Sequence, residues 1–297
     1  MKKRFKKNTA GENVFNIFNT LFLFCFSIMC LYPLWYVIVA SVSDSNLIMA
    51  HRGFLLKPLG FTWQSYKLAF KDPMIIKGYG NTLFIVGVGT ALSMSLTSMG
   101  AYFLSRKNVQ WRNAVMFLIV FTMFFSGGMI PFYLTVNSYG LNNSRWALII
   151  PGAVNTFNLI IMRTAFLTVP DSLEESAKLD GAGHWRILFK IFIPLLKPTM
   201  AVILLYYVVE KWNAWFNASI FLQDRNLYPL QLVLRGILIQ NDTSTMTASS
   251  LSVADTAPVG ETIKYAVIII ATLPILCIYP FLQKYFVKGI MIGAIKG

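Results

Sequence analysis

Long apolar stretches separated by short polar segments dominate this sequence. A helix needs about 20 mainly apolar residues to cross the hydrocarbon core of a bilayer, because it rises 1.5 Å per residue. Six stretches meet this length, and we expect membrane spans at residues 14–42, 82–104, 114–136, 146–169, 198–222 and 265–287. In lipid, every backbone polar group must be satisfied within the protein, so the pattern predicts an all-α membrane protein with six transmembrane helices.

The composition excludes two large classes of protein. Charged residues make up 13% of the chain and hydrophobic residues 56%, whereas an average soluble domain has about 25% charged residues. The mean hydropathy is +0.59. A soluble globular protein is therefore excluded, and so is a disordered chain, which requires low hydrophobicity and high net charge.

The basic residues orient the predicted spans. The chain has 26 Lys and Arg against 12 Asp and Glu, a net charge of +14. Many of them lie in the N-terminal arm 1–13, in the loops after the second and fourth spans, and around the C-terminal tail 289–297; the loop 43–81 is the exception. Loops rich in Lys and Arg stay inside, so we expect both termini in the cytoplasm and one transmembrane domain over 14–288. This distribution indicates that the basic residues face membrane lipid and do not form a surface for nucleic acid.

Two of the predicted spans carry an unusual number of polar side chains. A charge at the bilayer centre costs about 2.5–3.5 kcal/mol, so such residues face the bundle interior or a wet cavity, or pair with a neighbouring helix. On one continuous helix, Tyr206, Glu210, Asn213 and Asn217 would form a single stripe. We predict that six residues line a substrate pathway: Asn155, Asn158, Tyr206, Glu210, Asn213 and Asn217. A role of Glu210 in assembly is the alternative.

Two local patterns refine the picture. Ser126-Gly-Gly-Met-Ile-Pro131 predicts a break in the third span, because proline removes a backbone hydrogen bond and glycine bends easily. Trp63, Tyr66 and Phe70 share one face of a short helix before the second span, with Thr62 as a candidate N-cap.

The segment 170–197 predicts a helix–turn–helix elbow on the cytoplasmic face. Asp171 or Ser172 can cap a first helix, whose first turn carries acidic residues, as the helix dipole favours. The run Asp180–Gly183 ends that helix in a tight turn, and a second amphipathic run follows up to Pro194. These features fit either a docking site for a partner or an ordinary interfacial loop.

Several enzymatic signatures are missing from the sequence. The chain contains no G-x-x-x-x-G-K-[ST] phosphate loop, no Gly-x-Ser-x-Gly elbow and no His, Cys or carboxylate set at metal-ligand spacing. We therefore predict no catalytic residue, no metal site and no enzymatic activity for this chain.

One motif indicates a family. The run Glu175-Ser-Ala-Lys-Leu-Asp-Gly-Ala-Gly183, followed by Ile191-x-Ile-Pro194, resembles the EAA loop of ABC-importer permeases, E-A-A-x-x-D-G-A-x(8)-I-x-L-P. Ser176 and Ile193 are mild departures from that pattern. Nearly the whole chain resembles the carbohydrate-uptake permeases of this class, specifically the MalG-like members that handle complex oligosaccharides.

The resemblance implies an architecture and a set of partners. Such permeases have the ABC type I importer fold, with six spans, in the bacterial inner membrane. They assemble with a second homologous permease, two ATPase subunits and an extracytoplasmic solute-binding protein. The ATPase subunits bind ATP and Mg²⁺, so no cofactor is expected in this chain. The EAA loop would couple the ATPase to the pathway through Glu174, Glu175, Ala177, Asp180, Gly181 and Ala182.

Two other functions stay open at this point. The same architecture could import a non-sugar solute, since the EAA loop does not identify the cargo. A self-sufficient, ion-coupled secondary transporter is the other alternative. That class usually has inverted repeats and several intramembrane acids, whereas Glu210 is the one acid well inside a predicted span here.

Overall fold

The computed structural model describes residues 9–240, 262–278 and 280. All regular secondary structure within these residues is helical. The chain divides into two compact units, one formed by 1–71 with 243–270 and the other by 72–242 with 271–297. The predicted N-terminal arm and C-terminal tail lie mostly or wholly outside the described residues.

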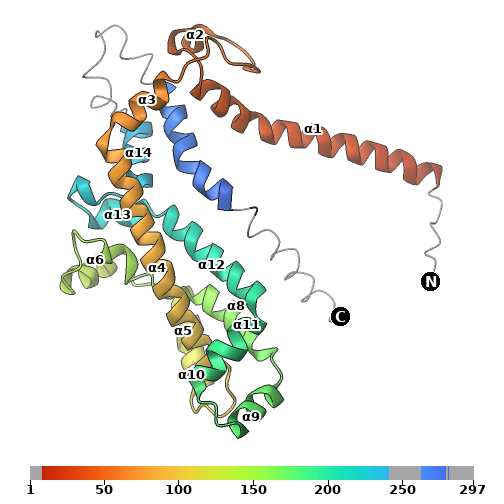
Figure 1. Ribbon diagram of the computed structural model, residues 1–297, viewed down its shortest axis with the longest axis vertical. Coiled ribbons are helices and arrows are strands. Elements are labelled where there is room, and N and C mark those ends of the chain that lie inside the picture. The colour runs from red at the N-terminus through yellow and green to blue at the C-terminus, as the bar shows by residue number, and fades with distance from the viewer. Residues whose placement is uncertain (1–8, 241–261, 279, 281–297) are drawn as a thin grey trace. The chain divides into compact units, whose positions relative to one another are not determined.

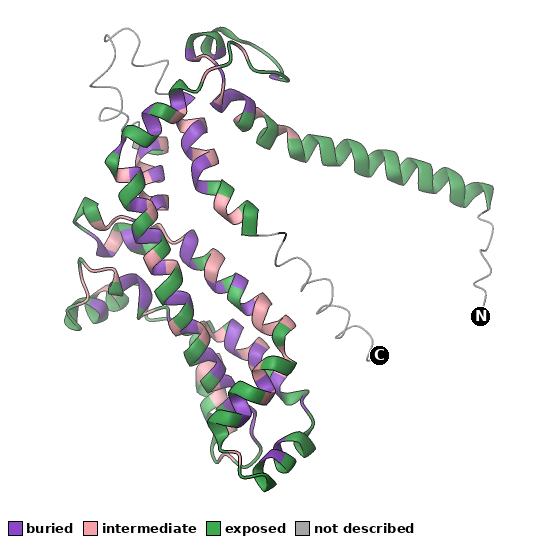
Figure 2. Ribbon diagram, viewed as in Figure 1, coloured by how far each residue is buried: buried purple, intermediate pink, exposed green. Residues whose placement is uncertain are grey.

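The first unit begins with one long apolar helix, α1, Ala10–Ser41. A capping box starts it: the Glu12 carboxylate accepts from the Thr9 backbone N–H at 2.7 Å, and Thr9 Oγ1 accepts from the Glu12 N–H at 3.3 Å. Figure 2 shows α1 exposed along most of its length, and burial begins only at Val39. The helix confirms the first predicted apolar segment, with its start four residues earlier.

The rest of the first unit is built around the C-terminal end of α1. Two short helices follow, α2 (Ser45–Ala50) and α3 (Gln64–Lys71). Val39 and Ala40 form a small core with Ile48 and Leu55. The predicted helix forms as α3, but its predicted start is wrong. Trp63 lies just before the helix, and its carbonyl accepts from the Lys67 N–H at 3.0 Å. Thr62, the candidate N-cap, lies one residue earlier still, and its Oγ1 accepts from the Gln64 N–H at 3.2 Å.

The second unit is organised along α4, Pro73–Ser105. Asp72 caps this helix, and Pro73 occupies the first helical position, where its missing N–H costs nothing. Along its length α4 packs on α8 (Thr156–Leu167) and α12 (Lys197–Trp212) (Figure 1). Small residues on the buried face, such as Ser93, allow the helices to approach closely.

Several of the predicted spans are broken in the structure. The predicted third span consists of α5 (Arg112–Phe124) and α6 (Met129–Ser138), which are bent by 118° relative to each other. Gly128 lies at the break with φ +84°, a conformation that glycine adopts without steric cost. This confirms the predicted break at Ser126–Pro131.

The other helices of the second unit are shorter. They are α7 (Trp146–Ile149), α9 (Asp171–Leu179), α10 (His184–Ile187), the π-helical η1 (Leu188–Phe192), α11 (Ile193–Leu195), α13 (Phe216–Phe221), the 3-10 turn η2 (Arg225–Leu227) and α14 (Leu230–Gln240). An apolar helix, Thr262–Ile278, crosses the boundary between the two units and covers the first part of the predicted sixth span.

Two of the described helices, α1 and α4, are individually long and apolar enough to cross a membrane. The number rises to four when each strongly bent pair, α5 with α6 and α10–α11 with α12, is taken as one span. The structure therefore supports the all-helical fold without establishing six spans.

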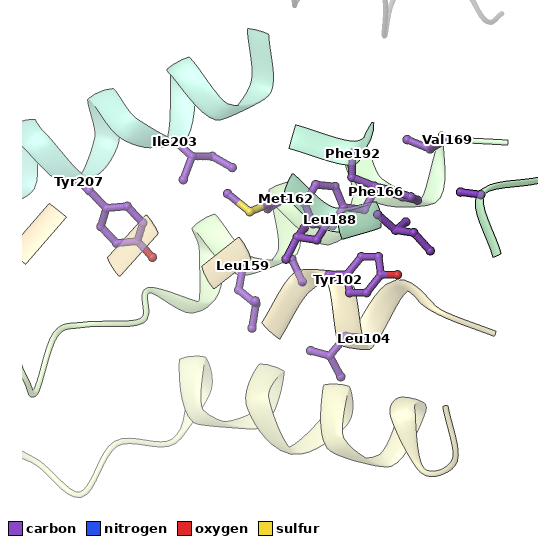
Figure 3. Close-up of a cluster of buried hydrophobic side chains, with 13 residues drawn as sticks. Tyr102, Leu104, Leu159, Met162, Phe166, Val169, Leu188, Phe192, Ile203 and Tyr207 are labelled. Atoms are coloured by element: carbon purple, nitrogen blue, oxygen red, sulfur yellow. The ribbon is translucent and has the colours of Figure 1, made fainter. Parts of the chain in front are cut away.

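An aromatic core joins α4, α8 and the segment α10–α12 at one end of the second unit (Figure 3). Phe192 contacts Tyr102 and Phe166 edge to face, with ring centroids 5.4 and 5.6 Å apart. Ile203 and Tyr207 extend this cluster along α12. Edge-to-face pairs are favourable beyond the area they bury, so these aromatic contacts help to hold the three segments together.

Candidate functional site

The predicted elbow forms around α9 and the turn that follows it. The Ala182 N–H donates to the Ala177 carbonyl at 2.9 Å, and the Gly181 N–H donates to the Lys178 carbonyl at 3.0 Å. Gly181 has φ +75°, so the helix ends in a Schellman motif that favours glycine at this position. The predicted tight turn is confirmed. The predicted side-chain cap is wrong, because Pro170 occupies the N-cap position and offers no side-chain hydrogen bond.

The six predicted coupling residues divide between two faces of the elbow. Glu174 and Ala177 are buried, whereas Glu175, Asp180 and Gly181 are exposed, and Ala182 is half-buried. Within the residues that the structure describes, neither exposed carboxylate has a cationic partner. The exposed set is therefore available to a partner protein, and the buried set holds α9 to the rest of the chain.

Glu174 lies in a buried cluster of charges. Its Oε2 accepts a hydrogen bond from the Arg106 guanidinium, and its Oε1 is 2.8 Å from Lys178 Nζ. Burial raises the pKa of Glu174, but the hydrogen bonds from Lys178 and Arg106 outweigh this effect and leave the pKa below its usual range. Glu174 is thus held as a carboxylate inside the protein.

Arg106 connects three segments. It is the C-cap residue of α4, and it also donates to the Phe166 carbonyl at the end of α8 at 3.3 Å. Its guanidinium carbon lies 4.6 Å from the centre of the Phe192 ring. Sequence reasoning used Arg106 only as an orienting charge, because its partner Glu174 is 68 residues away in the chain.

A second, exposed ion pair lies beside the first. Lys107 Nζ is 2.5 Å from the Asp171 carboxylate, and the two side chains are 75% and 52% exposed. The hydrogen bond from Lys107 lowers the pKa of Asp171. Because both groups are solvated, this pair contributes little to stability, and it provides a natural control for the buried pair.

The predicted pathway residues partly gather around a cavity. A cavity of about 420 Å³ is lined by Met123, Gly152, Val154, Asn155, Thr156, Phe157 and Glu210. Asn155 is the N-cap of α8, where its Oδ1 accepts from the Phe157 N–H at 3.0 Å. Its Nδ2 approaches Glu210 Oε2 at 3.5 Å. A carboxylate thus lies next to a helix N-terminus, where the positive end of the dipole stabilises it.

The other predicted pathway residues lie elsewhere. Tyr206 is exposed, and its ring centroid is 6.5 Å from that of Phe157 at the cavity. Asn158 is buried and is not among the lining residues. Asn213 donates to the Val209 carbonyl at 2.9 Å, and Asn217 is an exposed residue of α13.

The prediction of one continuous polar stripe is wrong. Helix α12 ends at Trp212, and α13 begins at Phe216 after a non-helical connection. Asn213 and Asn217 therefore do not continue the helical face that carries Tyr206 and Glu210. The Trp212 side chain donates to the Ala271 carbonyl at 3.2 Å, a tertiary contact that the local pattern did not indicate.

Two further residues of α12, Lys211 and Tyr207, face α4. Lys211 is 5% exposed, and a Cβ added to Gly89 would lie only 2.8 Å from its Cδ. The Tyr207 hydroxyl is 2.7 Å from Thr97 Oγ1 and accepts from the Asn155 N–H at 3.0 Å. Lys211 therefore points away from the exposed Glu210, as the helical spacing predicts.

Comparisons with known proteins agree with this architecture. The family model described as "Binding-protein-dependent transport system inner membrane component" matches residues 93–292. Protein LplC of Bacillus subtilis (strain 168) is 42% identical over 98% of this chain and 97% of its own length. The polygalacturonan/rhamnogalacturonan transport system permease protein YtcP of the same organism is 44% identical over 93% of this chain and 96% of its own.

A solved structure gives the same result at the level of the fold. The crystal structure of a bacterial ABC transporter involved in the import of the acidic polysaccharide alginate contains a chain with a TM-score of 0.87 and 32% identity, covering 95% of this chain and 99% of that one. The resemblance to ABC-importer permeases drawn from the EAA loop is confirmed. The chain belongs to the family of binding-protein-dependent transport system inner membrane components, which are multi-pass transport permeases and not enzymes.

Proposed function

We propose that this chain is a permease subunit of an ABC importer that takes up an oligosaccharide. The observation that carries the proposal is the elbow: a membrane protein of this family presents Glu175, Asp180 and Gly181 on an exposed helix and turn. The sugar assignment is supported by two similar proteins, a polygalacturonan/rhamnogalacturonan transport system permease and an ABC transporter involved in the import of alginate.

The proposed topology has six spans with both termini in the cytoplasm. It comprises the basic arm 1–13, the transmembrane domain 14–288 with the coupling loop 170–197, and the tail 289–297. The clustering of Lys and Arg in the arm and in alternate loops supports this orientation. The bent helix pairs and the shorter apolar helices, including Thr262–Ile278, supply segments for the spans beyond α1 and α4.

The chain would work only within an assembly. The proposed partners are a second homologous permease, two ATPase subunits that bind ATP and Mg²⁺, and an extracytoplasmic solute-binding protein. Hydrolysis would take place on the ATPase subunits, whose movement the exposed face of α9 receives. Glu175 and Asp180 are suited to basic groups on such a partner because both carboxylates are solvent-accessible.

The proposed pathway passes the cavity at Asn155 and Glu210. Its amide and carboxylate groups can exchange hydrogen bonds with sugar hydroxyls, while Phe157 and the neighbouring Tyr206 offer aromatic faces. Asn158, Asn213 and Asn217 stay in the proposal as candidates for the gate or for contacts with the partner permease. Alternating access would expose this cavity to each side of the membrane in turn.

The proposal is tested by ATP hydrolysis in the purified complex. The chain is co-expressed with its partner permease and ATPase, reconstituted in nanodiscs and mixed with sugar-loaded binding protein. We expect hydrolysis to rise at least about tenfold over the rate without binding protein, because the loaded protein favours the closed ATPase dimer. Failure of this chain to co-purify with the ATPase would contradict the proposal.

A further inference from the structure

The contact between α4 and α9 is built around one arginine. Arg106 is 5% exposed and Glu174 is 7% exposed. The Arg106 guanidinium donates to the Glu174 carboxylate and to the Phe166 carbonyl, and its Nε donates to Ser105 Oγ at 3.1 Å. Its planar group is thereby fixed in one orientation, which a lysine ammonium at this position could not achieve.

We propose that Arg106 is a positioning residue that transmits the movement of α9 to α4, by keeping the two helices together as one body through its ion pair with Glu174. The inference rests on the proposed function, since an ATPase must move α9. It assigns opposite tasks to two adjacent acids: Glu175 faces the ATPase, and Glu174 faces inward to α4.

The burial of the pair explains why it can bear this task. Separating buried partners exposes neither charge to water, which is strongly unfavourable, and Glu174 would keep only the half-exposed Lys178 as a counter-charge. The neighbouring pair, Lys107 with Asp171, is exposed and separates easily because water replaces each partner. A pull on α9 is therefore transmitted through Arg106 and hardly through Lys107.

A second contact on α4 extends the connection to the cavity. The Thr97 hydroxyl lies about 14 Å from the Arg106 end of the helix, at 1.5 Å of rise per residue. It is 2.7 Å from the Tyr207 hydroxyl, which accepts from the Asn155 N–H at 3.0 Å. Asn155 in turn contacts Glu210. Helix α4 thus joins the elbow at one position and the cavity at another.

The experiment measures sugar transported per ATP hydrolysed in proteoliposomes that contain the complete complex. The variants are Arg106→Glu, Glu174→Arg and the double swap, with assembly checked by gel filtration. We expect each single change to lower the ratio at least about tenfold, and the swap to restore it at least about fivefold above either single variant. Restoration stays incomplete because an arginine at 174 would lie one turn from Lys178.

Controls separate coupling from folding. Lys107→Glu with Asp171→Lys, at the exposed pair, should change the ratio less than about twofold. Arg106→Lys keeps the charge but loses the planar guanidinium and its several N–H donors. The variant should therefore assemble normally and lower the ratio about threefold. This variant keeps the test decisive if the charge reversals fail to reach the membrane.

The outcomes are distinct. An unchanged ratio of sugar transported to ATP hydrolysed, in assembled complexes of Arg106→Lys or of either charge reversal, would overturn the proposal. A double swap with a ratio no higher than that of the worse single variant would overturn it as well. A wild-type complex without ATP-dependent uptake would instead contradict the proposed function.

Discussion

The Tyr207 hydroxyl accepts a hydrogen bond from the backbone N–H of Asn155 at 3.0 Å. This bond ties α12 to the first turn of α8, and the same hydroxyl lies 2.7 Å from Thr97 Oγ1 on α4. Three helices therefore meet at one oxygen atom beside the cavity that Asn155 and Glu210 line. The position of the cavity wall depends on this meeting point.

Removal of that oxygen should loosen the cavity wall. We expect Tyr207→Phe to lower the free energy of unfolding by about 1–3 kcal/mol, because the Asn155 N–H and the Thr97 hydroxyl lose their partner. Thermal unfolding of the detergent-solubilised complex measures this. Tyr206→Phe is the matched control on the same helix and should leave the midpoint unchanged, since Tyr206 is exposed. Equal midpoints for both variants would refute the role of the Tyr207 hydroxyl.

A side chain at the turn of the elbow should uncouple the transporter. Gly181 has φ +75°, and a left-handed conformation costs a residue with a side chain about 1–2 kcal/mol. An added Cβ there meets no atom within 4 Å, so the cost comes from the backbone. We expect Gly181→Val to lower sugar uptake at least about tenfold while the protein still inserts and hydrolysis continues.

The matched control lies two residues away. Gly183 has φ −72° and equally free space around its Cβ, so valine fits there without strain. Uptake by Gly183→Val should remain close to that of the wild type. A similar loss in both variants would show that bulk on the elbow, and not the left-handed turn, causes the effect.

Acid should weaken the attachment of α9 through Glu174. The pKa of Glu174 is lowered in the folded protein, so the folded state binds the proton less readily than the unfolded state. Its stabilisation is present above the unfolded pKa of about 4.3 and is lost as pH falls through the folded pKa. The unfolding midpoint should therefore drop below about pH 4.3, and Glu174→Gln should flatten that drop.

The exposed pair gives the comparison for this pH profile. Lys107 also lowers the pKa of Asp171, but salt screens a solvated pair much more than a buried one. Added NaCl should therefore abolish the part of the acid sensitivity that Asp171→Asn removes. It should leave in place the part that Glu174→Gln removes. An acid profile of Glu174→Gln identical to that of the wild type would contradict the stabilising role of this carboxylate.

The charge of Glu210 should influence which sugars pass. A carboxylate in the cavity repels the carboxylates of a uronate sugar, whereas a neutral sugar carries no charge for it to repel. We expect Glu210→Gln to raise the uptake of a uronate oligosaccharide relative to a neutral one of equal length. Competition uptake measures this ratio, with Glu175→Gln as the control. A ratio that stays constant or falls would remove Glu210 from the pathway.

Some of these features follow from the sequence, and others depend on tertiary contacts. The turn at Gly181 and the break at Gly128 are predictable because each backbone conformation favours glycine. The end of α12 at Trp212 is not, since no proline or glycine marks it. The pairing of Arg106 with Glu174 joins residues 68 positions apart, and local periodicity carries no information about such contacts. The sequence places Arg106 in the basic loop after the second predicted span and Glu174 in the EAA loop, without revealing that they meet.

The most direct test of the central claim is transport itself. Proteoliposomes containing this chain, its partner permease and the ATPase are loaded with ATP and Mg²⁺, and labelled oligosaccharide is added outside with the binding protein. The account predicts accumulation that requires hydrolysable ATP, the ATPase subunits and the binding protein together. Equal accumulation without the ATPase subunits, or accumulation driven by an ion gradient alone, would contradict it.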